Sequence, residues 1–215
     1  ERTEDGQDFE IKPMEIGTID VGRWMMDLDS VIYLHYYPTL VGFSENFDFT
    51  DEKRAGVVLW TGDGQPTREE VVVTNKENTK VIYTWAQNSK GEWYFSTPEI
   101  YAKNMGDIFY MRPYVVDQDG KIVYMEPVVG YSVELFSYNV MNDMNPKRDQ
   151  REKPLCGALL EYGASAQIYF DYNADNLVNK NVPNYGYDLE YYESYVDDMD
   201  YTSEHIVKLA GTLAL

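Results

Sequence analysis

The sequence predicts a mostly β fold, an immunoglobulin-like or jelly-roll-like sandwich with one or two packed α-helices in the C-terminal third. Short runs rich in β-branched and aromatic residues recur over the first 130 residues, and turn-forming residues separate them. After Tyr131 the apolar spacing changes to three and four residues, which is typical of helices. At 215 residues and 44% hydrophobic content, the chain can bury a substantial core.

The strand predictions follow these runs in order. Residues 30–37 carry apolar or aromatic side chains on both faces, which favours a strand covered on both sides. Further strands are expected at residues 57–60, 71–74 and 81–85. The last of these turns at residues 88–91 and returns through residues 93–95 as a hairpin. A second hairpin joins residues 107–116 to 121–129 through a turn ending in Gly120. Pro113 and Pro127 favour edge positions or bulges over a central strand, because proline lacks an N–H donor.

Two helices are expected after the strands. Ser132 is suited to cap the first, with Glu134 in its first turn. The second is predicted over residues 154–172, with an apolar stripe of Leu155, Leu159, Tyr162, Ala166 and Tyr169. We divide the chain into a flexible lead-in (1–15), a β-sandwich module with its helical segment (16–180), and a Tyr/Asp-rich tail with a terminal strand that could pack on the same domain (181–215).

Charge and composition exclude several classes of function. Lys and Arg number 18 against 37 Asp and Glu, so the formal net charge is −19, which argues against nucleic-acid binding. No apolar run approaches the roughly 18 residues of a membrane-spanning helix, so membrane insertion is not expected. Cys156 is the single cysteine, which excludes an internal disulfide and a cysteine-based zinc site.

Catalytic and cofactor motifs find little support in the sequence. There is no G-x-S-x-G segment, and His35, within a predicted strand, is interpreted as a satisfied core residue. Phosphate-binding and dinucleotide fingerprints are missing. We therefore expect a protein that is not an enzyme, with no cofactor and no assigned metal ligand. Calcium is kept as an open alternative to plain capping and a solvated acidic surface, using Asp171, Asp175 or the group Asp197, Asp198 and Asp200.

The unusual feature is the aromatic content, above all 20 tyrosines. In the tail, rings lie among acidic and amide side chains, where they could stack on sugar rings while the polar groups accept hydroxyl hydrogens. The alternative is that these rings only pack against the sandwich. The predicted ligand-binding residues are Tyr185, Tyr187, Tyr191, Tyr192 and Tyr195 in the tail, and Trp60, Trp85 and Trp93 in the strands.

Two segments carry a family resemblance. "EIYAKNMGDIFYMRPYVVDQDGKIVYMEPVVGYSV" and "LLEYGASAQIYFDYNADNLVN" contain, in order, the elements AK-x-MGD, Y-x-x-D-x-DG, YSV and YG-A-AQ-x-YF. In this the chain resembles, over roughly residues 30–180, a recurrent module of secreted and cell-surface proteins of anaerobic Gram-positive gut and rumen bacteria. The resemblance implies an extracellular or cell-surface, non-catalytic sandwich with a C-terminal helical segment, within a longer multidomain chain. It supplies no binding residues.

Together these observations lead to two functional hypotheses. The first is a carbohydrate-binding module that attaches a larger surface or secreted bacterial protein to polysaccharide. The second is a structural spacer or protein-interaction domain in an adhesin or a cellulase or cellulosome-type assembly. The expected partner is therefore a polysaccharide or another protein module, and neither nucleic acid nor membrane.

Overall fold

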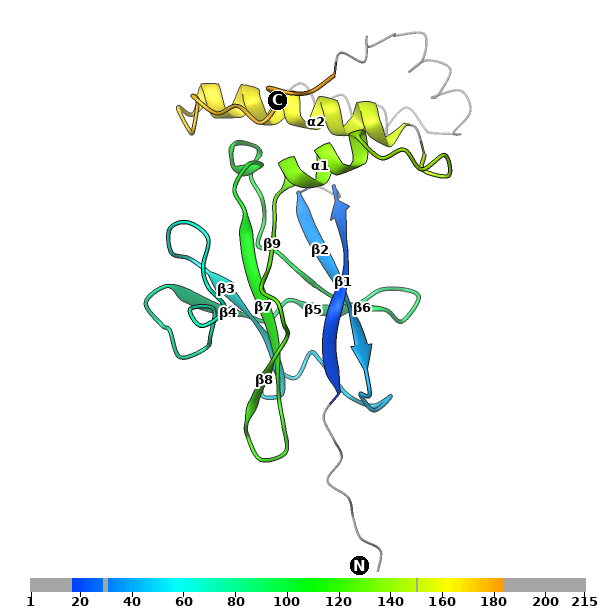
Figure 1. The fold of residues 1–215 in the computed structure, drawn as a ribbon, viewed down its shortest axis with the longest axis vertical. Coiled ribbons are helices and arrows are strands. Elements are labelled where there is room, and N and C mark those ends of the chain that lie inside the picture. Colours follow the sequence, from blue (N-terminus) through cyan, green and yellow to red (C-terminus); the bar gives the residue numbers. More distant parts are fainter. Residues whose placement is uncertain (1–16, 29–30, 150, 184–215) are drawn as a thin grey trace, which may run out of the picture. The chain divides into compact units, whose positions relative to one another are not determined.

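The computed structural model describes residues 17–28, 31–149 and 151–183 (Figure 1). Within these residues nine strands come first, interrupted by a short 3-10 helix, η1 (Ala102–Asn104), and two α-helices follow, α1 (Val133–Met141) and α2 (Glu152–Tyr169). The strands are β1 (Thr18–Asp27), β2 (Tyr33–Val41), β3 (Ala55–Trp60), β4 (Thr79–Ile82), β5 (Trp85–Gln87), β6 (Trp93–Ser96), β7 (Phe109–Val116), β8 (Ile122–Tyr124) and β9 (Val129–Tyr131). The predicted mostly β class with helices near the C-terminal third is thus confirmed.

The strands form two sheets. One has the order β1-β2-β6-β5, and the other has the order β4-β3-β7-β8 with β9 paired to β7. By contact density the chain divides into a sandwich unit, up to Met25 with His35–Thr97 and Phe109–Gly130, and a helical unit, Met26–Leu34 with Pro98–Ile108 and the residues from Tyr131 on. Both sheets belong essentially to the sandwich unit, and the two helices belong to the helical unit.

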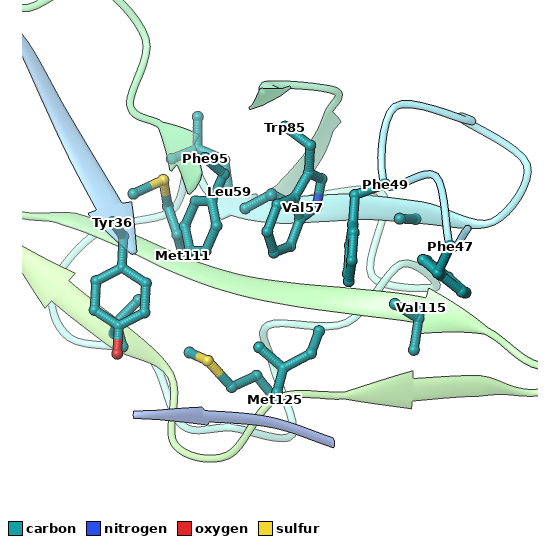
Figure 2. Close-up of a cluster of buried hydrophobic side chains, with 13 residues drawn as sticks. Tyr36, Phe47, Phe49, Val57, Leu59, Trp85, Phe95, Met111, Val115 and Met125 are labelled. Atoms are coloured by element: carbon teal, nitrogen blue, oxygen red, sulfur yellow. The ribbon is translucent and has the colours of Figure 1, made fainter. Parts of the chain in front are cut away.

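The core of the sandwich unit draws side chains from both sheets (Figure 2). Tyr36 and Phe95 come from the first sheet, and Val57 and Met111 come from the second. Phe47 and Phe49, on the loop before β3, add a group of rings whose centroids lie 4.6 Å apart. Because alternate residues of a strand point to opposite faces, these side chains meet between the sheets while their neighbours point outward.

The second predicted hairpin is confirmed, with β7 and β8 joined by the turn at Gly120. The first is confirmed in part: the turn at residues 88–91 joins β5 to β6, whereas residues 81 and 82 belong to β4 in the other sheet. Asn88 and Asp117 each accept hydrogen bonds from the backbone N–H groups two and four residues later. Gly91 and Gly120 both have φ of +79°, a conformation that glycine adopts without steric cost. The predicted helix cap is confirmed as well, since the Ser132 hydroxyl accepts from the Leu135 N–H at 3.0 Å.

Three local predictions were wrong. Residues 71–74 form turns instead of a strand. Their apolar side chains pack on the outer face of β3, so the segment is buried without pairing with a neighbouring strand. Pro113 lies inside the central strand β7, opposite Val57, where its carbonyl still accepts from the Met125 N–H at 2.9 Å. In α2 Ala166 is buried as expected, but most of the buried stripe runs one residue later than expected, through Cys156, Leu160, Gly163, Ala164 and Gln167.

The displaced stripe of α2 has a physical cause in the close approach of η1. A Cβ added to Gly163 would lie 2.7 Å from the Met105 sulfur and 3.3 Å from the Ala102 carbonyl oxygen. The helix therefore turns Gly163 and Ala164 toward η1, while Leu155 and Ile168 are exposed. Tyr169, predicted to belong to the buried stripe, is 82% exposed.

Candidate ligand-binding surfaces

Two of the three predicted strand tryptophans are part of the sandwich core. Trp85 is 6% exposed, and its ring centroid lies 4.7 Å from that of Phe49 and 5.1 Å from that of Phe95 (Figure 2). Trp93 is partly buried and also contacts Phe49, at 5.2 Å. The Trp85 ring is buried among these neighbours, so its surroundings are those of a packing residue.

Trp60 lies on the opposite sheet, at the end of β3. Its indole N–H donates to the Gly64 carbonyl at 3.2 Å, and a Cβ on Gly62 would lie 2.5 Å from the ring. The turn at residues 62–64 therefore rests on the indole. The remaining predicted residues, Tyr185, Tyr187, Tyr191, Tyr192 and Tyr195, lie outside the described residues, as do Asp197, Asp198 and Asp200.

An exposed group of aromatic side chains lies in the helical unit, where η1 meets the end of α2. We call Lys103, Tyr169, Phe170 and Tyr172 the ring cluster. Phe170 is 59% exposed, and its centroid lies 4.9 Å from that of Tyr169 with the planes nearly perpendicular. The Lys103 ammonium lies 5.2 Å from the Phe170 centroid and 5.5 Å from the Tyr172 centroid, within the range of cation–π contacts. The three rings and the Lys103 ammonium thus contact one another at the surface.

Polar groups border the ring cluster. Oδ2 of Asp107 accepts from the Tyr172 hydroxyl and from the Asn104 side-chain amide, both at 2.7 Å. The carboxylate raises the pKa of Tyr172, because it is the neutral phenol that donates this bond. Both bonds reach the same oxygen, so Oδ1 is the atom that can accept a hydrogen from a ligand hydroxyl. Tyr101, which precedes η1, is also 65% exposed.

The segments that carried the resemblance build this surface. Gly163 of YG-A-AQ-x-YF lets Met105 of AK-x-MGD contact α2, as described above. The side-chain oxygen of Gln167 accepts from the Val178 N–H at 2.9 Å and so ties the following loop to the helix. In that loop Asp171 has φ of +49°, a left-handed conformation that Asp tolerates. Several motif residues therefore have structural roles, and they place the rings beside Asp107.

A second aromatic surface lies on the outer face of the β1-β2-β6-β5 sheet. We call Arg23, His35, Tyr37, Glu92 and Tyr94 the sheet-face group. The Tyr94 centroid lies 4.8 Å from that of His35 and 5.0 Å from that of Tyr37. The Arg23 guanidinium carbon lies 4.5 Å from the Tyr37 centroid, and Nη2 donates to Glu92 Oε1 at 2.9 Å. The first sheet thus presents rings and a cation on its outer face.

His35 is not the core residue that the sequence suggested, because its ring belongs to this outer face. Its Nδ1 lies 2.7 Å from the Ser96 hydroxyl, and the two residues are directly opposite in the β2–β6 register. A serine–histidine pair suggests acyl-transfer chemistry, but such chemistry needs N–H donors beside the serine for the oxyanion. The Ser96 N–H already donates to the Thr84 hydroxyl at 3.2 Å. We interpret the contact as a cross-strand pair.

Cys156 is buried in α2, and burial raises the pKa of its thiol to about 11. A nucleophilic cysteine needs a lowered pKa, so this thiol has the properties of a packing residue. Over residues 17–28, 31–149 and 151–183, no group of three or more His, Cys, Asp or Glu side chains is placed to hold a metal ion, and Asp171 and Asp175 belong to no such group. In the same part of the chain, none of the helices has the length and apolar character to cross a membrane.

Comparison with protein-family models, with curated proteins and with solved structures finds nothing that matches this chain. The argument about function therefore depends on the surfaces themselves. Sequence reasoning missed the ring cluster because helical periodicity assigned Tyr169 to the buried stripe. The available clue was the run of small residues in α2, which marks the face that approaches a neighbour closely.

Proposed function

We propose that the chain is a non-catalytic carbohydrate-binding module of a larger extracellular or cell-surface bacterial protein. The observation that carries the proposal is the ring cluster. Tyr169 and Phe170 are well exposed, although the sandwich unit buries most of its large aromatic side chains. Binding a ligand with an apolar face removes the exposed rings from contact with water, which lowers the free energy. Sugar rings have such apolar faces.

The polar groups beside the rings suit the hydroxyl groups of a sugar. Asp107 Oδ1 can accept a hydroxyl hydrogen, and the Lys103 ammonium can donate to a hydroxyl oxygen. The contacts of Lys103 with Phe170 and Tyr172 restrict its side chain before a ligand arrives. This lowers the entropy that binding has to remove. The recurring segments around the cluster support an extracellular setting in a longer chain, as the resemblance implies.

The chemistry of the described nucleophiles supports a binding role. The Cys156 thiol is buried with a raised pKa, and the Ser96 N–H is engaged where an oxyanion would need it. Neither group is prepared for covalent catalysis. The proposed protein acts by holding a glycan.

A structural spacer or protein-interaction domain is the second candidate, and one observation favours it. On β1, which lies at the end of the described sheet order, Val21 is 61% exposed and Met25 is 46% exposed. Exposed aliphatic side chains on a terminal strand are typical of surfaces that pair with another protein. This candidate predicts that substitution of Val21 and Met25, rather than of the rings, would weaken association with a partner.

Affinity electrophoresis of the full chain through gels containing soluble glycans, with pull-down on insoluble ones, tests the proposal. We expect at least one glycan to retard the wild-type chain. Phe170→Ala and Tyr169→Ala should each weaken that binding about tenfold or more, because large central side chains dominate binding energy. The matched control is Tyr83→Ala, an exposed ring in the sandwich unit, which should bind as the wild type does.

The outcomes separate the two candidates. No retardation or pull-down by any glycan would rule out carbohydrate binding. Equal loss of binding in the Tyr83 control and in the cluster variants would show that the ring cluster is not the site. Circular dichroism of each variant verifies that it is folded before its affinity is compared.

A further inference from the structure

Within the described residues, the sheet-face group contains a cation, Arg23, whose guanidinium donates to one acceptor, Glu92. The Arg23 guanidinium lies over the Tyr37 ring, with its central carbon 4.5 Å from the ring centroid. A guanidinium has five N–H donors in a planar fork, and the bond to Glu92 uses Nη2. Stacking on a ring covers the face of the guanidinium and leaves its N–H edge directed outward. That edge has the geometry that a carboxylate binds with two parallel hydrogen bonds.

The bond between Arg23 and Glu92 is exchangeable. Their side chains are 54% and 42% exposed, and ion pairs this exposed contribute little to folding stability. Glu92 does not depend on Arg23 alone, since its other oxygen accepts from the Asn88 side-chain amide at 2.9 Å. A carboxylate from a ligand could therefore replace Glu92 on Arg23 without leaving Glu92 unpartnered.

The rings beside Arg23 indicate what kind of molecule carries that carboxylate. Tyr37, Tyr94 and His35 follow one another across β2 and β6 at centroid distances of 5.0 and 4.8 Å. Tyr37 is only 8% exposed, so a pyranose ring next to the guanidinium would lie against the Tyr94 and His35 end of this row, where the hydroxyl of Ser96 also lies. A peptide C-terminus offers the same carboxylate, but it carries a rigid ring for the row only when its last residue is aromatic or proline.

We propose that the sheet-face group is a second binding site, specific for a uronic acid residue of an acidic polysaccharide. Arg23 holds the sugar carboxylate in place of Glu92, and the row of rings supports the sugar. The net charge of −19 does not forbid this, because at 0.15 M ionic strength the Debye length is about 8 Å, so distant carboxylates are screened. The site is separate from the ring cluster and needs neither Tyr169 nor Phe170.

Isothermal titration of the full chain with trigalacturonic acid tests the proposal, and its methyl ester is the matched uncharged ligand. We expect the acid to bind and the ester to bind at least tenfold more weakly. Arg23→Met should weaken binding of the acid at least tenfold. Glu92→Gln should strengthen it about threefold, because the competing carboxylate is gone. Glu69→Gln removes the acidic partner of another exposed pair, Arg68–Glu69, and should change nothing.

The decisive result is that Arg23→Met should weaken binding of the acid while Glu92→Gln should strengthen it. If the ion pair were purely structural, both substitutions would change the affinity in the same direction. Equal binding of acid and ester, weaker binding in Glu92→Gln, or no binding of the acid at millimolar concentration would each overturn the proposal. Binding of a free peptide carboxylate in preference to the sugar would overturn it as well. If Phe170→Ala abolished acid binding, the site would be the ring cluster. Neutral glycan binding that Arg23→Met leaves unchanged would uphold the proposed function independently.

Discussion

The two outer faces of the sandwich unit carry the same arrangement in different surroundings. On the first sheet Arg23 lies 4.5 Å from the Tyr37 centroid, and on the second Arg112 lies 4.5 Å from the Tyr124 centroid. Each arginine also forms an ion pair with a glutamate. Stacking and ion pairing are therefore common to both, and they do not distinguish a structural role from a binding role.

What differs is burial and the number of acceptors. The Arg112 side chain is 7% exposed, and besides its glutamate partner it donates to the Met125 carbonyl at 3.0 Å and to the Arg68 carbonyl at 2.7 Å. The turns at residues 61–78 cover this face, and they bury Val71 completely against Val58. The Arg23 side chain, in contrast, is 54% exposed. An arginine saturated with backbone acceptors fixes a loop, whereas an exposed one with a single carboxylate can exchange it.

Replacing Arg112 with methionine should give the largest effect. Two backbone carbonyls lose their donors in a buried place, which costs about 3 kcal/mol of the free energy of unfolding in total. Urea denaturation of wild type and Arg112→Met measures it. A loss below about 1 kcal/mol would show that water or another donor replaces the guanidinium, and the contrast between the faces would disappear.

Val71→Ala should come next. Removing two methyl groups from a fully buried side chain costs about 2 kcal/mol, from the lost burial and the cavity that remains. Val21→Ala on the exposed β1 is the matched control and should stay within about 0.5 kcal/mol. Thermal and urea unfolding of both variants provide the comparison. Equal losses of stability in the two variants would mean that the turns at residues 61–78 do not bury the outer face of the second sheet.

Burial on the outer face of the second sheet should also affect how the stability of the protein changes at alkaline pH. Burial, with Tyr83 nearby, raises the pKa of Tyr114 to about 12, above the unfolded value near 10. The folded state thus holds this proton more tightly, so the stabilisation is complete below pH 10 and is lost as the pH rises toward 12. Tyr114→Phe should lose less stability than wild type between pH 9 and pH 11 in urea titrations. An identical decline in both proteins would contradict the assignment.

Arg23→Met should have the smallest effect on stability, below about 1 kcal/mol, because both partners of its ion pair are exposed. The same denaturation experiment measures it beside Arg112→Met. The difference between the two arginines, rather than either value alone, tests the contrast. A loss in Arg23→Met as large as in Arg112→Met would make the first face structural as well.

The sequence predicted the fold class through signals that act locally. Gly91 and Gly120 marked the hairpin turns, and Ser132 marked the helix start, because each acts on its own neighbouring backbone. The strand prediction for residues 71–74 failed because a segment rich in β-branched residues can be buried without pairing with another strand. Periodicity also failed for α2, because close approach to η1 favoured Gly163 over the larger side chains.

The candidate surfaces were harder to predict than the fold. Whether Trp85 or Tyr94 points inward depends on strand register, which composition does not contain. The ring cluster joins Lys103 to Phe170 across 67 positions, and nothing local links them. The requirement for glycine at position 22 also depends on a distant segment, because a Cβ there would lie 1.8 Å from the Tyr37 carbonyl oxygen of the neighbouring strand. Such constraints exist only between segments distant in the sequence.

The most direct test of the central claim, that exposed rings of this chain hold a glycan, is a glycan array probed with the intact wild-type chain and with Phe170→Ala side by side. The account predicts a saturable signal on one or more glycans that falls at least tenfold in the variant. An array without signal for the wild type, or equal signals for both proteins, would contradict it.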